Sequence, residues 1–125
     1  MAWNRLAWLK DRHRGQRCVI VANGPSLNRM DLRFLRHEHV IGMNKIHLGF
    51  ATLGIYPRYY VVVNPKVAEQ SAAEIRALNC VRFVGARAAR AAGLHDDALT
   101  HILQTESPPA RFSTDLSAGV HEGWT

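Results

Sequence analysis

Short runs of apolar residues along this chain alternate with segments in which apolar residues recur at helical spacing. The runs at 17–22, 39–43, 58–64 and 80–85 have the length and composition of strands, and 58–64 is the most continuously apolar of them. A strand at the edge of a sheet is predicted for 100–106. Strands that alternate with helices indicate an α/β layered fold with a mostly parallel sheet.

The segments between these strands have helical patterns of different strength. The strongest covers 65–79, with Pro65 at its start and apolar residues near a 3.6-residue period. A shorter helix is predicted to end at Leu35, with Ser26 or Asn28 as its cap. Its apolar side is expected to consist of Leu27, Met30, Phe34 and Leu35. The arginine-rich segment 86–100 is also predicted to be helical.

Polar residues follow three of the predicted strands at their carboxyl ends. The first strand leads into the turn Asn23-Gly24-Pro25-Ser26, the second into Asn44 and the third into Asn64. Parallel strands end at the same edge of a sheet, which is where open α/β sheets bind ligands. We therefore expect these residues to form a polar rim. Asparagine amides can bind sugar hydroxyls, base edges or phosphates, and a glycine lets the backbone approach a ligand closely.

The turn at 23–26 is not one of the common phosphate-binding loops. It lacks the Gly-Lys-Ser/Thr of a P-loop and has one glycine where the dinucleotide fingerprint has three. Each asparagine alone is more often a turn former or a helix cap than a ligand contact. The three asparagines at matched strand ends together favour a nucleotide site, held by side-chain amides and one close backbone approach.

The C-terminal segment 113–125 carries a second group of candidate residues. Ser117 could cap a helix, and Gly119 could let a ligand approach. His121 is the titratable group there whose ordinary pKa suits acid–base work near neutral pH, and we take it as the candidate catalytic residue. A single histidine is more often structural. No cysteine and histidine spacing typical of zinc occurs, so no metal ligands are predicted.

The composition and net charge limit the classes of molecule that this chain is expected to bind. The chain has 125 residues, a formal net charge of +6 and a sequence pI near 10.0. This positive charge suits a polyanion, an anionic membrane surface or a phosphorylated small molecule, and solubilising surface charge is the alternative. The sequence has no basic patch interleaved with aromatic residues and no nucleic-acid recognition motif. A small-molecule nucleotide or nucleotide-sugar is therefore the predicted partner, and nucleic acid is not.

The two cysteines and the apolar content indicate a cytoplasmic protein. Cys18 and Cys80 each begin a predicted strand and are expected to be buried core residues in a reducing compartment. No run approaches the ~20 apolar residues of a membrane helix, and the N-terminus lacks the apolar core of a secretory signal. Residues 1–16 are expected to form a basic amphipathic helix that packs on the 17–125 domain; peripheral contact with a membrane or a partner is the alternative.

Four segments together resemble a bacterial and archaeal superfamily. They are "VIVANGPSLNRMDLRFL", "VIGMNKIHLGF", "GIYPRYYVVVNPKVAEQ" and "FSTDLSAGVHEGWT". The superfamily contains the 6-hydroxymethylpterin diphosphokinase MptE-like domains and the related family 42 sialyltransferases. The resemblance extends from about Arg17 to the end of the chain. The order "NGPSL", asparagine after a second strand, "NP" after a third and "S-x-G-V" is more specific than any one of these motifs.

This resemblance implies a Rossmann-like three-layer fold with a nucleotide beside the glycine turn. In the MptE-like branch, ATP with magnesium transfers pyrophosphate to a pterin hydroxymethyl group, and this is the predicted function. In the sialyltransferase branch the donor is a CMP-sugar, used without metal. There the asparagines matching Asn23, Asn44 and Asn64 line the nucleotide-sugar site, with the pair matching Ser117 and Gly119 beside it. The MptE-like domains often have aspartate in place of Asn64, which weakens the diphosphokinase assignment.

The family pattern continues beyond the position of Thr125. A further core strand follows there, as do the catalytic His and the paired Tyr of the sialyltransferases. The resemblance therefore predicts a domain that is incomplete at its C-terminus, with an uncovered sheet face and a tendency to self-associate. A third function follows, in which the chain is a catalytically inactive fragment that only binds nucleotide.

Overall fold

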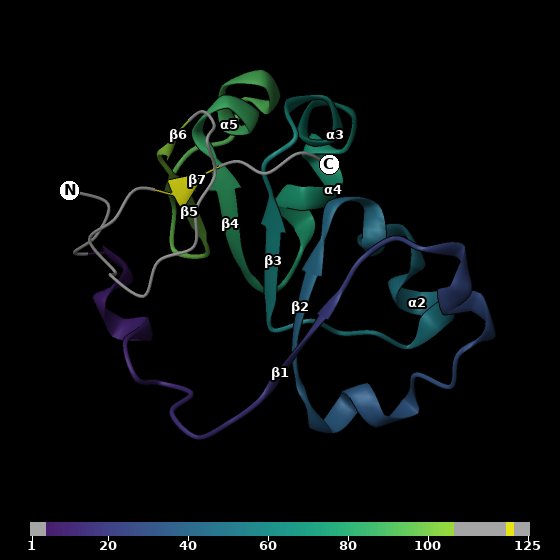
Figure 1. Ribbon diagram of the computed structural model, residues 1–125. Coiled ribbons are helices and arrows are strands. Elements are labelled where there is room, and N and C mark those ends of the chain that lie inside the picture. Colours follow the sequence, from purple (N-terminus) through teal and green to yellow (C-terminus); the bar gives the residue numbers. More distant parts are fainter. Residues whose placement is uncertain (1–4, 107–119, 122–125) are drawn as a thin grey trace.

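Five parallel strands form the main sheet of the structure (Figure 1). The computed structural model describes residues 5–106 and 120–121. The strands are β1 (Cys18–Val21), β2 (His39–Met43), β3 (Tyr59–Val62), β4 (Val81–Gly85) and β5 (Thr100–Leu103). Every neighbouring pair in this sheet is parallel. The prediction of an α/β fold with a mostly parallel sheet is confirmed.

The strands lie side by side in the order in which they occur in the chain, β1-β2-β3-β4-β5. Each crossover therefore moves to the next strand in the same direction. Right-handed crossovers of this kind place all the connecting segments on one face of the sheet. The main core lies on that face, where Val21, Val40, Tyr60 and Val84 from the strands pack with residues of the connecting segments such as Ile75.

The helices are all short. The 3-10 helices are η1 (Ala7–Leu9), η2 (Pro25–Arg29), η3 (Arg33–His37) and η4 (Asn44–Gly49). The α-helices are α2 (Phe50–Leu53), α3 (Pro65–Gln70), α4 (Ala72–Ala77) and α5 (Ala86–Ala92). In Figure 1 the carboxyl ends of β3 and β4 point towards α3 and α5, which pack against each other.

Two predicted helices are interrupted. The prediction of one helix over 65–79 is corrected to α3 and α4, which are separated at the buried Ser71, where φ is −121°. The prediction of a helix ending at Leu35 is corrected to η2 and η3. The reason lies at Asp31, whose carboxylate accepts a hydrogen bond from the Arg33 N–H at 3.1 Å and forms a local turn between the two helices.

The expected cap and apolar side of this segment are also wrong in part. Among the described residues, no side chain caps η2 or η3, so neither Ser26 nor Asn28 has the predicted role. Leu35 is buried, as predicted, but Met30 and Phe34 are about half exposed, at 54% and 50%. A 3-10 helix has three residues per turn, whereas an α-helix has about 3.6. Apolar residues spaced for an α-helix therefore do not all point to the core in η2 and η3.

The second face of the sheet is covered by the N-terminal segment. His13 Nε2 lies 2.6 Å from the Tyr59 hydroxyl, and the Trp8 ring lies against His101 with 6.2 Å between ring centroids. The connecting helices, the sheet and this segment form the three layers of the fold. Of the alternatives for residues 1–16, packing on the domain is the arrangement that residues 5–16 adopt, as a short helical segment that includes η1 and is followed by turns.

The prediction that the first strand is buried is wrong. β1 is the edge strand of the sheet, and its alternate residues Cys18 and Ile20 lie on the face away from the helices. Ile20 is 64% exposed and the Cys18 thiol is free and exposed, whereas Cys80 is buried as predicted. Periodicity alone does not distinguish a central strand from an edge strand in a parallel sheet, which explains the error.

A second, two-stranded sheet pairs β6 (Thr105–Glu106) with β7 (Val120–His121) in parallel. The predicted edge strand over 100–106 therefore divides into β5, at the edge of the main sheet, and β6. Within the described ranges, no helix has the length and apolar character needed to cross a membrane.

Candidate functional site

The first two strands bring two of the predicted asparagines to the same level of the rim. Val21 pairs with Gly42, so Asn23 and Asn44 each lie two residues beyond that pair. The Asn23 side chain crosses from one strand end to the next, because its Nδ2 donates to the Met43 carbonyl at 3.1 Å. Its Oδ1 has no hydrogen bond within the described residues, so this acceptor is open to a ligand.

Asn44 has an unusual backbone conformation. Its φ is +54°, in the left-handed region, where asparagine is one of the few side chains often found. The Asn44 carbonyl accepts from the Tyr60 hydroxyl and lies 3.2 Å from His47 Nδ1. Since a carbonyl can only accept, Nδ1 carries the proton of that ring. Two donors thus fix the Asn44 backbone, while its side chain makes no hydrogen bond in the part of the chain that the structure describes.

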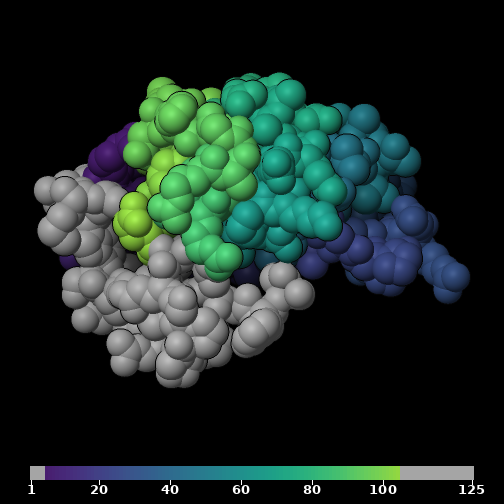
Figure 2. Space-filling view, turned by 90° about the horizontal axis from the view of Figure 1, so that it is seen from above, coloured from purple at the N-terminus to yellow at the C-terminus, as the bar shows by residue number. Residues whose placement is uncertain are grey.

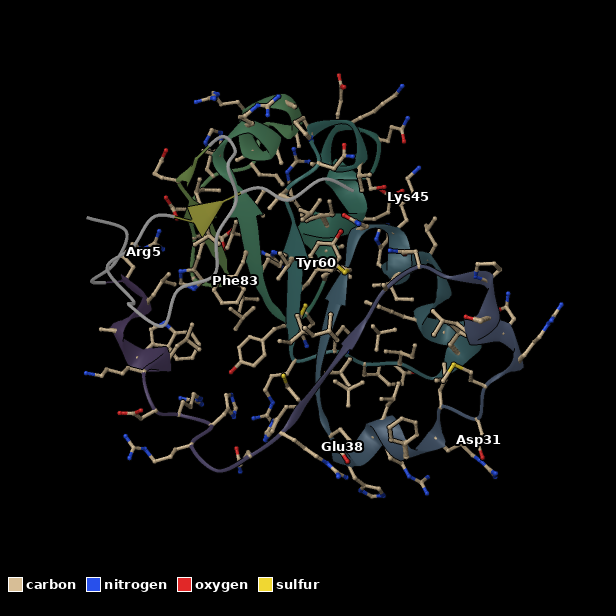
Figure 3. All side chains as sticks on the ribbon, in the orientation of Figure 1. Arg5, Asp31, Glu38, Lys45, Tyr60 and Phe83 are labelled. Atoms are coloured by element: carbon tan, nitrogen blue, oxygen red, sulfur yellow. The ribbon has the colours of Figure 1, made fainter. Side chains whose placement is uncertain are left out.

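The core holds this conformation in place through Tyr60. Tyr60 is fully buried, and Figure 3 shows its ring in the middle of the sheet. Burial raises the pKa of Tyr60 well above its ordinary value, so the hydroxyl remains a donor at physiological pH. The neighbouring Lys45 donates from Nζ to Gln70 Oε1 at 2.8 Å, which ties η4 to α3 and keeps a cation near the rim.

Asn64 is a helix cap. Its Oδ1 accepts from the N–H groups of Lys66 at 3.0 Å and Val67 at 3.3 Å, and Pro65 occupies the first position of α3. The Asn64 side-chain oxygen is therefore engaged as a helix cap, which is the alternative to ligand contact given in the sequence analysis. Its amide nitrogen has no partner among the residues described and still lies at the carboxyl end of β3.

The turn after β1 is exposed along its whole length from Asn23 to Ser26. Gly24 has φ −76° and ψ 142°, an extended conformation that any residue can adopt, so backbone strain does not explain the glycine. A Cβ at this position would lie 3.3 Å from Ser26 Oγ. The glycine thus leaves the space beside the Ser26 hydroxyl free, and the close approach of a ligand there stays a prediction.

The predicted C-terminal residues are placed only in part. Ser117 and Gly119 lie outside the described residues. The backbone of His121 lies in β7, where it pairs with Glu106. Its proposed role in acid–base chemistry stays a prediction.

The rim residues themselves supply no carboxylate for magnesium, so a magnesium ion there would depend on the phosphates of its ligand. The rim offers amide and hydroxyl groups from Asn23, Ser26, Asn44 and Asn64, whereas Mg²⁺ is usually held by one or two carboxylates together with substrate phosphates. The Asn64 oxygen already accepts two backbone N–H groups. Throughout the described ranges, no three His, Cys, Asp or Glu side chains converge in a way that could hold a metal ion.

The structure also contains a cavity that the sequence did not reveal. It has a volume of about 840 Å³ and lies beside β5, between α5, the loop 93–96 and the N-terminal residues Arg5 and Leu6. Neither this cavity nor a smaller one of about 330 Å³, formed by residues of η2, η3 and α2, is lined by any of the three asparagines.

Comparison of the chain with protein-family models, with curated proteins and with solved structures finds no match. The assignment to MptE-like domains and family 42 sialyltransferases thus stays a prediction from the sequence motifs.

Proposed function

We propose that this chain is a nucleotide-binding transferase domain of the 6-hydroxymethylpterin diphosphokinase MptE-like type, which binds ATP at the carboxyl rim of β1, β2 and β3. The observation that carries the proposal is the rim itself. Asn23 and Asn44 lie level with each other on neighbouring strands. The Asn23 Oδ1 and the whole Asn44 side-chain amide have no hydrogen-bond partner among the described residues.

The dimensions and chemistry of the rim suit a nucleotide. Neighbouring strands lie about 4.8 Å apart, so the ends of β1 to β3 span about 10 Å. Over this distance the amides of Asn23, Asn44 and Asn64 offer donors and acceptors for a base edge and ribose hydroxyls. The Ser26 hydroxyl beside Gly24 can donate to a phosphate oxygen, and Lys45 supplies positive charge nearby.

One observation favours the second candidate, a glycosyl transferase of the sialyltransferase-like type that uses a CMP-sugar. Asn64 stands where a carboxylate would help to hold magnesium, and its oxygen is engaged as a helix cap. A CMP-sugar needs no metal in that family, so the amide rim suits it without further ligands. The third candidate is a catalytically inactive chain that only binds nucleotide. In this case the same rim residues would bind the nucleotide.

Calorimetric titration of the full chain tests these candidates. The ligands are ATP, ATP with magnesium, CMP and a CMP-sugar. Magnesium-dependent ATP binding would support the diphosphokinase type, and metal-independent CMP binding would support the glycosyl transferase. Nucleotide affinity in both cases should fall about tenfold in Asn23→Ala, which removes the open Oδ1 acceptor and the hydrogen bond to the Met43 carbonyl that orients it.

Asn44→Gly separates ligand contact from backbone conformation. Glycine adopts φ near +54° without strain, so this variant keeps the turn and loses only the amide. We expect normal stability with weakened nucleotide binding. The matched control is Asn79→Ala, because Asn79 is an exposed asparagine at the opposite, amino end of β4. No binding of any of the four ligands, or equal losses in Asn79→Ala and Asn44→Gly, would overturn the proposal.

A further inference from the structure

The cavity beside β5 has the size and lining of a small-molecule site. Its volume of about 840 Å³ is within the usual range for ligand pockets, about 300–1,000 Å³. Apolar walls come from Leu6, Ala86, Ala89, Leu94 and Ile102. The N-terminal segment closes it on one side. In Figure 2 the N-terminal segment (purple) lies beside the later, green part of the chain. Arg5 donates from Nη2 to the Asp97 carbonyl at 3.1 Å.

The charged side chains that line the cavity carry a net positive charge. Arg5 forms an ion pair with Asp96, whose Oδ1 also accepts from the Ile102 N–H at 3.0 Å. Arg90, in the last turn of α5, lines the same cavity and has no ion pair with any described residue. One guanidinium without an ion-pair partner among the described residues therefore faces a space that has both apolar and polar walls. A planar guanidinium is well matched to a carboxylate, which it can bind through two hydrogen bonds.

A buried histidine adds an unsatisfied polar group. His101 is only 6% exposed, and neither its Nδ1 nor its Nε2 has a hydrogen-bond partner among the described residues. The ring is held between Phe83, stacked at 5.8 Å, and Trp8, at 6.2 Å. Burial, and then the charge of Arg5, lowers the pKa of His101, so the ring is neutral at pH 7 and offers one donor and one acceptor. Buried polar groups normally have hydrogen-bond partners, so among the described residues these two nitrogens are available to a polar group of a ligand.

We propose that the cavity beside β5 is a binding site for a small monoanionic carboxylate with a planar apolar body. The carboxylate is bound by Arg90, and the apolar body packs between Leu94 and Ile102. The imidazole of His101 supplies the further polar contact. The site is independent of the nucleotide rim, because none of the rim asparagines lines it.

Titration of the full chain with benzoate tests the site. Binding is followed by calorimetry and by the proton NMR signal of the His101 ring, which should shift as benzoate fills the cavity. Benzyl alcohol has the same ring without the charge, and inorganic phosphate has charge without the ring. Both should bind at least tenfold more weakly than benzoate. Equal binding of benzyl alcohol, or no shift of the His101 signal, would overturn the proposal.

Two variants and a control separate ligand contact from stability. Arg90→Ala should lower benzoate affinity at least tenfold and keep the fold, since alanine is the best helix former. His101→Phe keeps the ring stack and removes both nitrogens, and it should lower the affinity at least threefold. The control is Arg36→Ala in η3, away from the cavity, which should leave the affinity within twofold. Unchanged binding in Arg90→Ala, with native circular dichroism, would overturn the assignment.

Discussion

Arg82 is the residue whose replacement most directly tests the energetics of this fold. It lies on β4, is 5% exposed, and makes contacts with three other segments. Its Nε donates to Thr100 Oγ1 at 3.0 Å, its Nη1 donates to the Leu78 carbonyl, and its Nη2 lies 3.6 Å from Asp97 Oδ1. Arg82 thus joins the end of the α4 segment to β5 through the sheet.

Replacement by methionine keeps most of the apolar stem and removes every polar contact. Each hydrogen bond to a charged group contributes about 1.5–3 kcal/mol, and two such bonds are lost. Loss of the buried charge offsets part of this cost. The carboxylate of Asp97 is not left unpaired, because its side chain is 59% exposed and accepts from the N–H groups of Leu99 and Thr100. We therefore expect Arg82→Met to lower the free energy of unfolding by about 3 kcal/mol.

Urea unfolding followed by far-ultraviolet circular dichroism measures this change. The control is Arg36→Met, an exposed arginine in η3, which should change the free energy of unfolding by less than about 0.5 kcal/mol. Thr100→Val removes one partner of Arg82 and should cost about 1 kcal/mol. If Arg82→Met is as stable as the parent chain, the buried guanidinium contributes no net stability and the reasoning is refuted.

Two further predictions concern pH and thiol reactivity. The pKa values of His39 and His101 are lowered, in both cases mainly by burial, so the unfolded chain binds these protons at higher pH than the folded chain. Stability should therefore fall as the pH drops below the ordinary histidine pKa of about 6.5, and melting temperatures that are equal at pH 7.5 and pH 5.5 would contradict this. Cys18 is exposed, whereas Cys80 is buried and burial raises its pKa, so Ellman's reagent should label one thiol quickly in the folded chain and both in urea. Loss of the fast phase in Cys18→Ser checks the assignment, and a fast phase of two thiols would refute it.

The sequence predicts the strands well because each is a short apolar run bounded by turn residues. β2 matches its predicted range, 39–43, and β3 and β4 fall within theirs. The exposure of β1 was missed because strand order depends on how the crossovers pack, which local periodicity does not report. The break in the helix predicted over 65–79 is not apparent from the sequence for a related reason, since it depends on how α3 and α4 pack around the buried Ser71.

The sequence predicts where the candidate site residues lie in the fold better than it predicts their hydrogen bonds and ion pairs. The sequence places Asn23, Asn44 and Asn64 after their strands, and the structure puts them there. The left-handed conformation of Asn44 depends on a hydrogen bond from the hydroxyl of Tyr60, which lies sixteen residues later in the chain. The cavity beside β5 depends on the ion pair between Arg5 and Asp96, which lie near opposite ends of the described chain. Such contacts leave no local pattern, so they could be found only from the fold.

The order of the strands affects how a ligand would be held at the carboxyl rim of β1 to β3 and in the cavity beside β5. In doubly wound sheets the strand order reverses, and ligands bind in the crevice at that point. Across the described strands of this sheet the order never reverses, so the sheet lacks the switch point at which that crevice forms. A nucleotide bound as proposed would be held by side-chain amides along this edge. The cavity at β5 has apolar walls, because the N-terminal segment folds back over the last strand of the main sheet. The proposed carboxylate site should therefore bind its ligand partly through buried apolar surface, and the proposed nucleotide site should bind mainly through hydrogen bonds.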